Sequence, residues 1–357
     1  MRAGRYPPAM VSTTQLLALV QAKGAQGLFS LPEPVIRRLA GRPVQVDGRT
    51  LDPEMQLLLR VMGLAGPAVE TLSITKGRAK YTEAFQMLGG SQPIGAVTDR
   101  TIDGPGGPLG LRFYTPRGLS GRSPALVYLH GGGWVYGDLD AYDGVCRFLA
   151  EQAQVRVVSV DYRLAPEAPF PAGFEDAWAA WQWVVEHAAG LGIEPTAIAV
   201  GGDSAGGNLS ALVAQHAARH DDVQAPAFQL LIYPATDFVE ERPSRTLLGE
   251  GYLLTKAFMD LCSDTYLVGD EDRADARMSP LRHPVDGVAP AYLVTAGFDP
   301  LRDEGSAYAE HLRAAGVPVE HVEESGLIHG FANMVGIGRS APRAMRRAAA
   351  ALQRGLS

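Results

Sequence analysis

The chain has 357 residues, of which 46% are hydrophobic and 20% charged, a balance typical of a globular protein with a sizeable core. Its formal net charge of −7 argues against non-specific binding to nucleic acid, which requires clustered lysine and arginine. The sequence has no apolar run of about 18 residues and therefore predicts no membrane span. The run LLALV near the start is too short for a signal-peptide core.

The two cysteines, Cys146 and Cys262, are too few for a disulfide framework. Their neighbours do not stand at metal-ligand spacings either. We interpret both as free thiols, which favours a reducing compartment. The sequence therefore predicts a cytoplasmic location.

Residues 1–90 contain helix-like segments and no strong strand signal. The clearest segments are 12–24 and 52–66. In the second, Asp52 followed by Pro53 is a favourable helix start. Four apolar residues of this segment recur on one helical face, namely Met55, Leu58, Leu59 and Met62. The sequence thus predicts an N-terminal helical region packed on the main fold.

From about residue 95 the pattern changes to strands alternating with helices. Residues 97–116 contain two strand-like runs joined by a Gly/Pro turn, which predicts a hairpin. The strands predicted after it are 125–130, 155–162, 196–202, 228–234, 291–297 and 319–324. The helices predicted among them are 143–153, 174–190, 208–220, 304–316 and 341–356. Such alternation predicts an α/β fold with a mostly parallel sheet covered by helices on both faces.

One long connection interrupts this alternation. Residues between 238 and 285 carry no strand signal and again look helical. A connection of that length in a compact domain usually has a function or a structure of its own. We interpret it, together with the N-terminal helices, as a cap over one end of the sheet.

The segment GGDSAGG (201–207) stands between a predicted strand and a predicted helix. A serine hydroxyl needs a base to become a good nucleophile, and a sharp strand-to-helix elbow exposes it to substrate. Such a crowded turn requires nearly side-chain-free residues two positions on either side of Ser204, and these are Gly202 and Gly206. A glycine-rich phosphate loop is the alternative, but this turn carries neither GK[ST] nor GxGxxG. Ser204 is therefore the predicted nucleophile.

A serine hydrolase also needs N–H donors where negative charge develops on the substrate oxygen. The elbow offers the N–H group of Ala205. A second source is HGGGW (130–134), where three glycines follow an apolar strand: Gly131, Gly132 and Gly133. An ordinary glycine turn is the alternative, but the three consecutive glycines and their place in the strand order favour an oxyanion loop. We interpret His130 as an anchor of that loop.

The best candidate for the base is His329, in GLIHGF after the last predicted strand. The other histidines lie in less suitable places: four on predicted helices (His187, His216, His220 and His311), one in the insertion (His283) and one within a strand (His321). A carboxylate should orient the base, and Asp299 ends the preceding strand. Asp303 and Glu304 are expected to begin a helix instead, and Asp237 is a weaker candidate.

At these residues the chain resembles the hormone-sensitive-lipase-like family of α/β hydrolases, also called bacterial family IV esterases. Serine, aspartate and histidine follow one another in the α/β-hydrolase order. The matching stretches are HGGGW (130–134), DYRLAPEAPFPA (161–172), GDSAGG (202–207), DPLRDEG (299–305) and HGF (329–331). The resemblance spans residues 95–335, and residues 51–62 look like that family's first cap helix.

The resemblance implies hydrolysis of carboxylic esters without a cofactor or metal, on an α/β-hydrolase fold with a helical cap. By position, Ser204 would be the nucleophile, His329 the general base and Asp299 its partner. The implied oxyanion donors are Gly132, Gly133 and Ala205. The residues that would support these motifs are His130, Gly131, Gly202, Asp203 and Gly206, with Asp203 marking the GDSAG branch. The stretch DYRLAPE would brace the oxyanion loop.

The implied organisation has two parts: an N-terminal helical cap region at 1–90, and a catalytic domain at 91–357 with a second cap insertion at about 238–285. The family analogy predicts short- to medium-chain esters as substrates. The expected partner is a small ester molecule and not a nucleic acid, and the chain is expected to be a monomer or homodimer.

Two other interpretations remain open from the sequence. The same three residues could cleave another acyl bond, in an amide or a lactone. Alternatively, the chain could bind a ligand without catalysis, as plant hormone receptors of this family do after losing the catalytic histidine. The presence of His329 argues against this second alternative.

Overall fold

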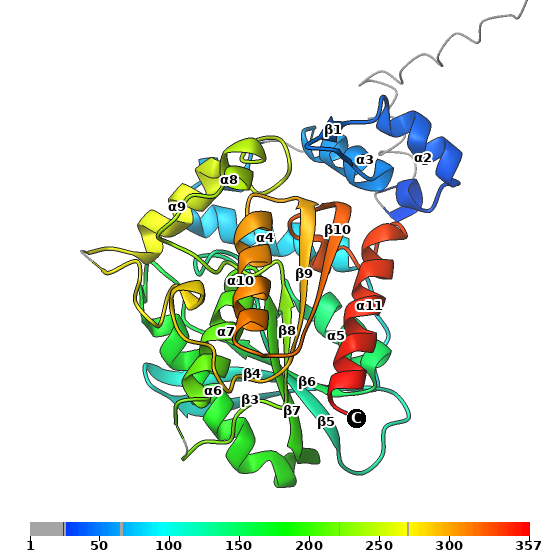
Figure 1. Cartoon of the computed structure of the whole chain (residues 1–357). Helices are drawn as coiled ribbons and strands as arrows, with labels where there is room; N and C mark the ends of the chain where they lie inside the picture. Colours follow the sequence, from blue (N-terminus) through cyan, green and yellow to red (C-terminus); the bar gives the residue numbers. More distant parts are fainter. Residues whose placement is uncertain (1–23, 25, 65–66, 221, 270) are drawn as a thin grey trace, which may run out of the picture.

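A computed structural model describes residues 24, 26–64, 67–220, 222–269 and 271–357 (Figure 1). The helix predicted at 12–24 falls almost entirely outside these residues. Among the described helices, none is both long and apolar enough to cross a membrane.

An eight-stranded sheet forms the centre of the molecule, in the order β10-β9-β8-β7-β5-β6-β4-β3. Its strands are β3 (Ala96–Gly104), β4 (Gly107–Thr115), β5 (Ser123–Leu129), β6 (Arg156–Asp161), β7 (Ile193–Asp203), β8 (Phe228–Ile232), β9 (Ala291–Phe298) and β10 (Val319–Ile328). The predicted hairpin, β3–β4, pairs antiparallel to β6 at one edge, and the other neighbours pair in parallel. The mostly parallel sheet predicted from the alternating pattern is therefore confirmed.

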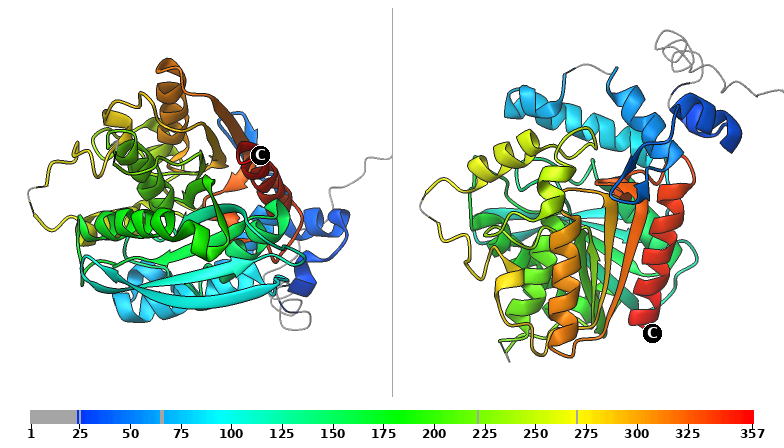
Figure 2. Two further views of the ribbon diagram at one scale, coloured as in Figure 1. Left: turned by 90° about the horizontal axis from the view of Figure 1, so that it is seen from below. Right: turned by 45° about the horizontal axis from the view of Figure 1, so that its top comes forward.

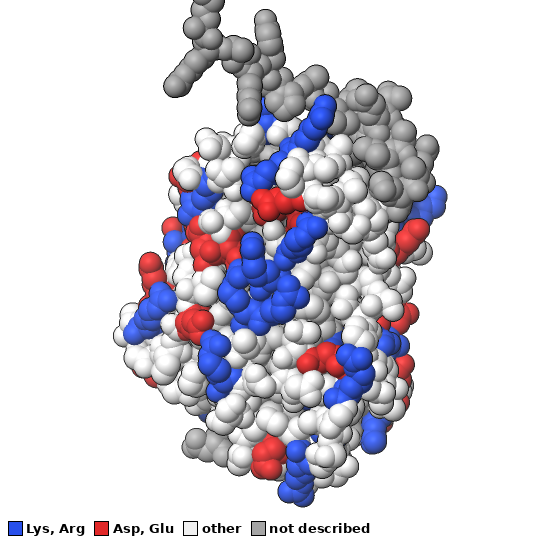
Figure 3. Space-filling view, turned by 90° about the vertical axis from the view of Figure 1, so that its right-hand side faces the viewer, with Lys and Arg blue, Asp and Glu red and all other residues white. Residues whose placement is uncertain are grey.

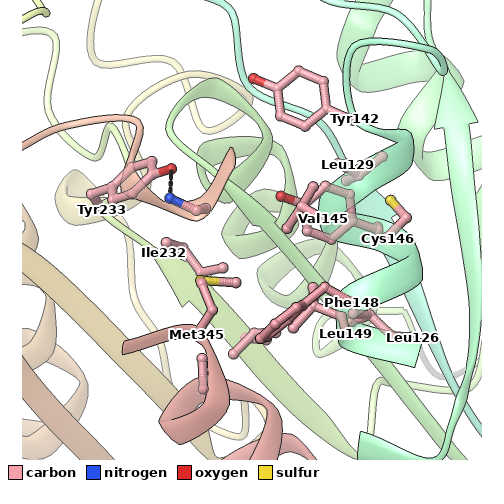
Figure 4. Close-up of a cluster of buried hydrophobic side chains, with 14 of the residues drawn as sticks. Leu126, Leu129, Tyr142, Val145, Cys146, Phe148, Leu149, Ile232, Tyr233 and Met345 are labelled. Carbon is pink, nitrogen blue, oxygen red and sulfur yellow. Dashed lines mark hydrogen bonds between the residues drawn. The ribbon is translucent and has the colours of Figure 1, made fainter. Parts of the chain in front are cut away.

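Helices cover both faces of the sheet (Figures 1 and 2). They are α5 (Asp143–Ala153), α6 (Ala172–His187), η2 (Ala188–Leu191), α7 (Ala205–Ala217), α10 (Arg302–Ala314) and α11 (Ser340–Gly355). Helix α11 packs beside α5 on one face, whereas α6 packs beside α7 on the other. Figure 4 shows the core beneath α5 and α11, where buried side chains such as Leu126, Phe148, Ile232 and Met345 meet.

The N-terminal region is helical, as predicted, and comprises α2 (Glu33–Ala40), α3 (Pro53–Met62), η1 (Val69–Thr71) and α4 (Ile74–Gly89). The Asp52 carboxylate caps α3 by accepting a hydrogen bond from the main-chain N–H of Glu54 at 2.8 Å. Three features were not predicted individually: helix α2, helix α4, and the two-residue strands β1 (Gln45–Val46) and β2 (Arg49–Thr50), which pair antiparallel.

The long insertion is also helical and contains α8 (Pro243–Leu247), α9 (Lys256–Tyr266) and η3 (Pro280–Arg282). Helix α9 contacts η1 of the N-terminal region, so the two segments adjoin. Figure 1 and the right-hand view of Figure 2 show α8 and α9 together with α3 and α4 above one end of the sheet. A last short helix, η4 (Phe331–Asn333), follows β10.

Charged side chains of both signs are interspersed on the face of the molecule shown in Figure 3. Ion pairs join α11 to β10. Arg354 lies 2.9 Å from Glu320, and Arg347 pairs with Glu324. Exposed pairs of this kind contribute little to stability, typically below about 1 kcal/mol each.

Candidate active site

Ser204 stands on a strained turn between β7 and α7. Its φ is 54° and its ψ −118°, in a region that non-glycine residues rarely adopt. The glycines on either side are required by packing: a Cβ atom on Gly202 or on Gly206 would run into the carbonyl oxygen of Leu129. The close approach of β5 to the elbow therefore explains the G-x-S-x-G pattern.

Two side chains form a hydrogen-bonded chain with Ser204. The Nε2 atom of His329, after β10, lies 2.9 Å from Ser204 Oγ. The Nδ1 atom lies 2.7 Å from Asp299 Oδ2. Asp299 is fully buried after β9, and its other oxygen accepts a hydrogen bond from Leu301 N–H at 2.8 Å. Because the carboxylate accepts from Nδ1–H, the lone pair of Nε2 faces the serine hydroxyl.

The competing carboxylates are engaged elsewhere. Asp237 pairs with Arg282, whose Nε lies 3.0 Å from Oδ1. Asp303 accepts from a main-chain N–H at 2.9 Å and Glu304 from another at 2.8 Å, both in the first turn of α10. The structure thus brings Asp299, and none of these three, into hydrogen-bond contact with His329.

The glycine loop after β5 adopts backbone conformations that favour glycine. Gly132 has φ 116° and Gly133 has φ 63°. A Cβ on Gly132 would meet the carbonyl of Tyr136, and one on Gly133 would meet the side chain of Cys262. Ala205 begins α7, where the first N–H groups have no intrahelical acceptor. Gly132 and Gly133 line the same cavity as Ser204.

The loop is anchored through His130. Its Nδ1–H donates to the Gly131 carbonyl at 2.8 Å, and its own carbonyl accepts from the Tyr162 hydroxyl at 2.7 Å. Ala165 N–H donates to the Trp134 carbonyl at 2.9 Å. Tyr162 and Ala165 belong to the DYRLAPE stretch, so this stretch supports the loop by direct hydrogen bonds. Burial lowers the pKa of His130 to about 4, which keeps its imidazole neutral near pH 7.

Asp203, predicted only as a residue that supports the elbow motif, makes hydrogen bonds that the sequence did not predict. Its buried carboxylate accepts hydrogen bonds from the Tyr128 hydroxyl at 2.8 Å, from Gly131 N–H at 3.0 Å and from the Tyr233 hydroxyl at 3.3 Å. Burial raises the pKa of this carboxyl to about 6. Asp203 therefore ties the elbow to the glycine loop, a role visible only once β5 and β8 flank β7.

A cavity of about 450 Å³ opens above Ser204 and His329. Its apolar walls come from α3, α4 and the 253–259 stretch: Leu58, Leu59, Met62, Tyr81, Phe85, Leu88, Leu253, Leu254, Phe258 and Met259. Met55, predicted on the same helical face, is buried in the core instead. Both helical segments thus enclose the space in front of the serine.

Besides Asp203, three charged residues line the cavity, and each is engaged by the protein. The Glu70 carboxylate accepts from the Thr255 hydroxyl at 2.8 Å. The Arg245 guanidinium donates to Glu304 at 3.1 Å, and the Lys80 ammonium donates to a main-chain carbonyl. Among the residues described, no three histidine, cysteine or acidic side chains are grouped as metal ligands would be.

Comparisons with known proteins show what this chain is similar to. The sequence profile of the alpha/beta hydrolase fold family Abhydrolase_3 matches residues 126–333. The carboxylic ester hydrolase LipN of Mycobacterium tuberculosis is 44% identical over 367 residues, which cover 100% of this chain and 97% of LipN. Carboxylesterase NlhH of the same species is 40% identical over 313 residues, covering 86% of this chain and 96% of NlhH.

A solved structure is similar over most of the chain. It is the ester hydrolase EH1AB1 from the metagenome of Lake Arreo, in complex with a derivative of bipyridine phosphonate. The TM-score is 0.82 at 40% sequence identity, over 85% of this chain and 98% of that chain.

Proposed function

Because the chain belongs to the hormone-sensitive-lipase-like family of α/β hydrolases and is a carboxylic ester hydrolase, we propose that Ser204, His329 and Asp299 form its catalytic triad. The observation that carries this proposal is the continuous hydrogen-bonded chain, 2.9 Å from Ser204 to His329 and 2.7 Å from His329 to Asp299. All three residues come from one chain.

Acylation begins when His329 Nε2 takes the proton of the Ser204 hydroxyl and Oγ attacks the ester carbonyl carbon. The negative charge that develops on the carbonyl oxygen is stabilised by the N–H groups of Gly132, Gly133 and Ala205. Collapse of the tetrahedral intermediate breaks the bond to the alcohol oxygen, which takes the proton from His329. The alcohol leaves, and the acyl group stays on Ser204.

Deacylation uses the same groups in the same order. His329 removes a proton from a water molecule, whose oxygen attacks the acyl carbon. The second tetrahedral intermediate collapses, the bond to Ser204 Oγ breaks, and Oγ recovers its proton from His329. Asp299 keeps Nδ1 protonated throughout and stabilises the imidazolium that forms twice in each cycle.

The two helical segments act as a cap in this proposal. The N-terminal region (1–90) and the insertion at about 238–285 supply the apolar walls of the cavity, and the remainder of 91–357 supplies the catalytic groups. A cavity of about 450 Å³ enclosed in this way favours esters with short to medium acyl chains.

Covalent labelling tests the proposal directly. A fluorophosphonate should modify the purified protein with one adduct per chain, because a phosphonate mimics the tetrahedral intermediate. Peptide mapping by mass spectrometry should place the adduct on Ser204. Esterase activity should fall in proportion to the fraction of chains that carry the label. An adduct on another residue, or full activity in the labelled protein, would show that the proposed nucleophile is wrong.

A further inference from the structure

Tyr233 occupies an unusual position directly after β8. Its φ is 35°, a conformation that is rare for a bulky residue, and its side chain is fully buried. Its main-chain N–H donates to the Val294 carbonyl at 2.6 Å, which ties this turn to β9. Backbone strain of this kind persists where the surroundings over-determine it, and it concentrates near functional sites.

The Tyr233 hydroxyl bridges the two loops that carry the nucleophile and the base. It donates to Asp203 Oδ2 at 3.3 Å, one residue before Ser204. It accepts from the N–H of Ala332 at 3.1 Å, three residues after His329, and Figure 4 shows this bond.

The ring of Tyr233 packs against the imidazole itself, with 4.5 Å between the two ring centroids. Phe331 also contacts this ring, with 5.0 Å between the two ring centroids in an edge-on arrangement. The hydrogen bond from His329 to Asp299 fixes one atom of the imidazole but leaves rotation about that bond. A ring packed against the imidazole restricts that rotation.

We propose that Tyr233 is a positioning residue that couples the serine elbow to the histidine loop and holds the His329 imidazole in line for proton transfer. The inference rests on the proposed function. Tyr233 does not line the cavity and has no exposed surface. It therefore acts on the proton transfers and not on substrate binding.

Tyr233→Phe tests this role because it removes the hydroxyl and keeps the ring. We expect kcat per active site to fall about tenfold, the effect of losing one well-placed hydrogen bond, with KM within about twofold of wild type. His329 must protonate the departing alcohol, so an ethyl ester should lose more than a p-nitrophenyl ester, whose leaving group needs little protonation. A purely structural role would lower both rates equally.

Two matched tyrosines serve as controls. The Tyr128 hydroxyl donates to the same Asp203 carboxylate but not to the histidine loop. Tyr128→Phe should therefore lose less turnover than Tyr233→Phe, and its loss should be equal for the ethyl ester and the p-nitrophenyl ester. The buried Tyr292 hydroxyl has no hydrogen-bond partner among the described residues, so Tyr292→Phe should retain wild-type kinetics. Equal losses in Tyr128→Phe and Tyr233→Phe would overturn the coupling to His329.

Active-site titration with a phosphonate counts folded sites, so partial unfolding does not imitate a loss of turnover. If Tyr233→Phe does not fold, Ala332→Pro removes the N–H that donates to the phenol, because proline has no main-chain N–H group. The same kinetic pattern is expected. If wild type is active and Tyr233→Phe has the same kcat, the coupling through Tyr233 is refuted and the proposed function stands. If wild type has no esterase activity and takes no label, the proposed function itself is refuted.

Discussion

The Nε2 atom of His329 lies 2.9 Å from Ser204 Oγ, although 125 positions separate the two residues in the chain. The topology explains this contact. Ser204 follows β7, Asp299 follows β9 and His329 follows β10, and these strands are parallel members of one sheet. Because the carboxyl ends of parallel strands meet at one edge of a sheet, residues that follow them converge.

The first prediction concerns the serine hydroxyl. Ser204→Ala should fold normally and lose at least about 10³-fold in kcat, because the acyl-enzyme route requires Oγ. Ester hydrolysis and circular dichroism measure the two effects. Ser263→Ala, at a serine of α9 that also lines the cavity, is the matched control and should keep most of the activity. A Ser204→Ala protein with wild-type turnover would contradict the proposed mechanism.

The parts of the fold with regular patterns could be predicted from the sequence. Strands that alternate with helices and are apolar on both faces predict a parallel sheet, because helices cover both faces of such a sheet. Helix α4 was missed because its residues are dictated by neighbours and not by helical periodicity. Gly77, for example, stands where a Cβ would lie 2.9 Å from the Tyr136 ring. No local pattern encodes such a long-range contact.

In the site too, local motifs could be predicted from the sequence, whereas long-range contacts could not. Ser204, Asp299 and His329 were singled out because each follows a strand within a distinctive motif. The bonds of Asp203 could not be foreseen, because its tyrosine partners lie 75 positions earlier, at Tyr128, and 30 positions later, at Tyr233. Hydrogen bonds between neighbouring strands depend on strand order and register, which a single sequence does not specify. The catalytic roles of these residues stay proposals.

The second prediction concerns the packing of the elbow. Gly206→Ala places a methyl group against the Leu129 carbonyl, so β5 and the elbow must move apart. We expect a loss of at least about 3 kcal/mol in the free energy of unfolding, measured by urea denaturation. Gly190→Ala is the control, since its Cβ would meet no atom within 4 Å, and it should change stability by less than about 0.5 kcal/mol. Equal stability of the two variants would rule out the steric explanation.

The third prediction concerns the effect of pH on stability through His130. Burial lowers its pKa to about 4 in the folded protein, against about 6.5 in the unfolded chain. Between about pH 6.5 and pH 4, His130 is protonated in the unfolded chain but stays neutral in the folded protein. The stability contributed by His130 is therefore complete above about pH 6.5 and is lost as the pH falls through 4, by about 3 kcal/mol in total.

Asp203 acts in the opposite direction. Burial raises its pKa from 3.8 to about 6, so the folded protein binds the proton first. The stability that Asp203 contributes to the folded protein is complete below about pH 3.8 and is lost as the pH rises through 6. The two effects partly cancel in wild type, and a variant is needed to separate them.

Replacing His130 with glutamine, an N–H donor that does not titrate, isolates its contribution. The difference in unfolding free energy between wild type and His130→Gln should change by about 3 kcal/mol between pH 7 and pH 4, with wild type losing more. Denaturation curves at several pH values measure this difference. His220→Gln, at an exposed histidine, is the control. Parallel stability curves for wild type and His130→Gln would contradict the assignment.

The last prediction concerns the length of the acyl chain. Each methylene buried in an apolar cavity contributes about 0.8 kcal/mol until the space is full, and further methylenes then cost turnover. With a cavity of about 450 Å³ lined by residues of α3, α4 and α9, we expect an optimum at roughly C4 to C8. Rates on p-nitrophenyl esters should rise from acetate to butyrate and fall steeply by palmitate. Hydrolysis of emulsified long-chain triglyceride as fast as soluble butyrate esters would mean that the cap opens as a lid.

Phe258 offers a direct test of the closed cavity. Its ring packs on Tyr136 with 5.2 Å between centroids, and its edge would lie 3.7 Å from a Cβ on Gly133, beside the proposed oxyanion loop. Phe258→Ala should therefore enlarge the space next to the acyl carbonyl and move the optimum toward longer chains. Val268→Ala, at an exposed residue outside the cavity, should leave the optimum unchanged. If Phe258→Ala lowered all rates equally without moving the optimum, Phe258 would support the oxyanion loop and would not limit the chain length.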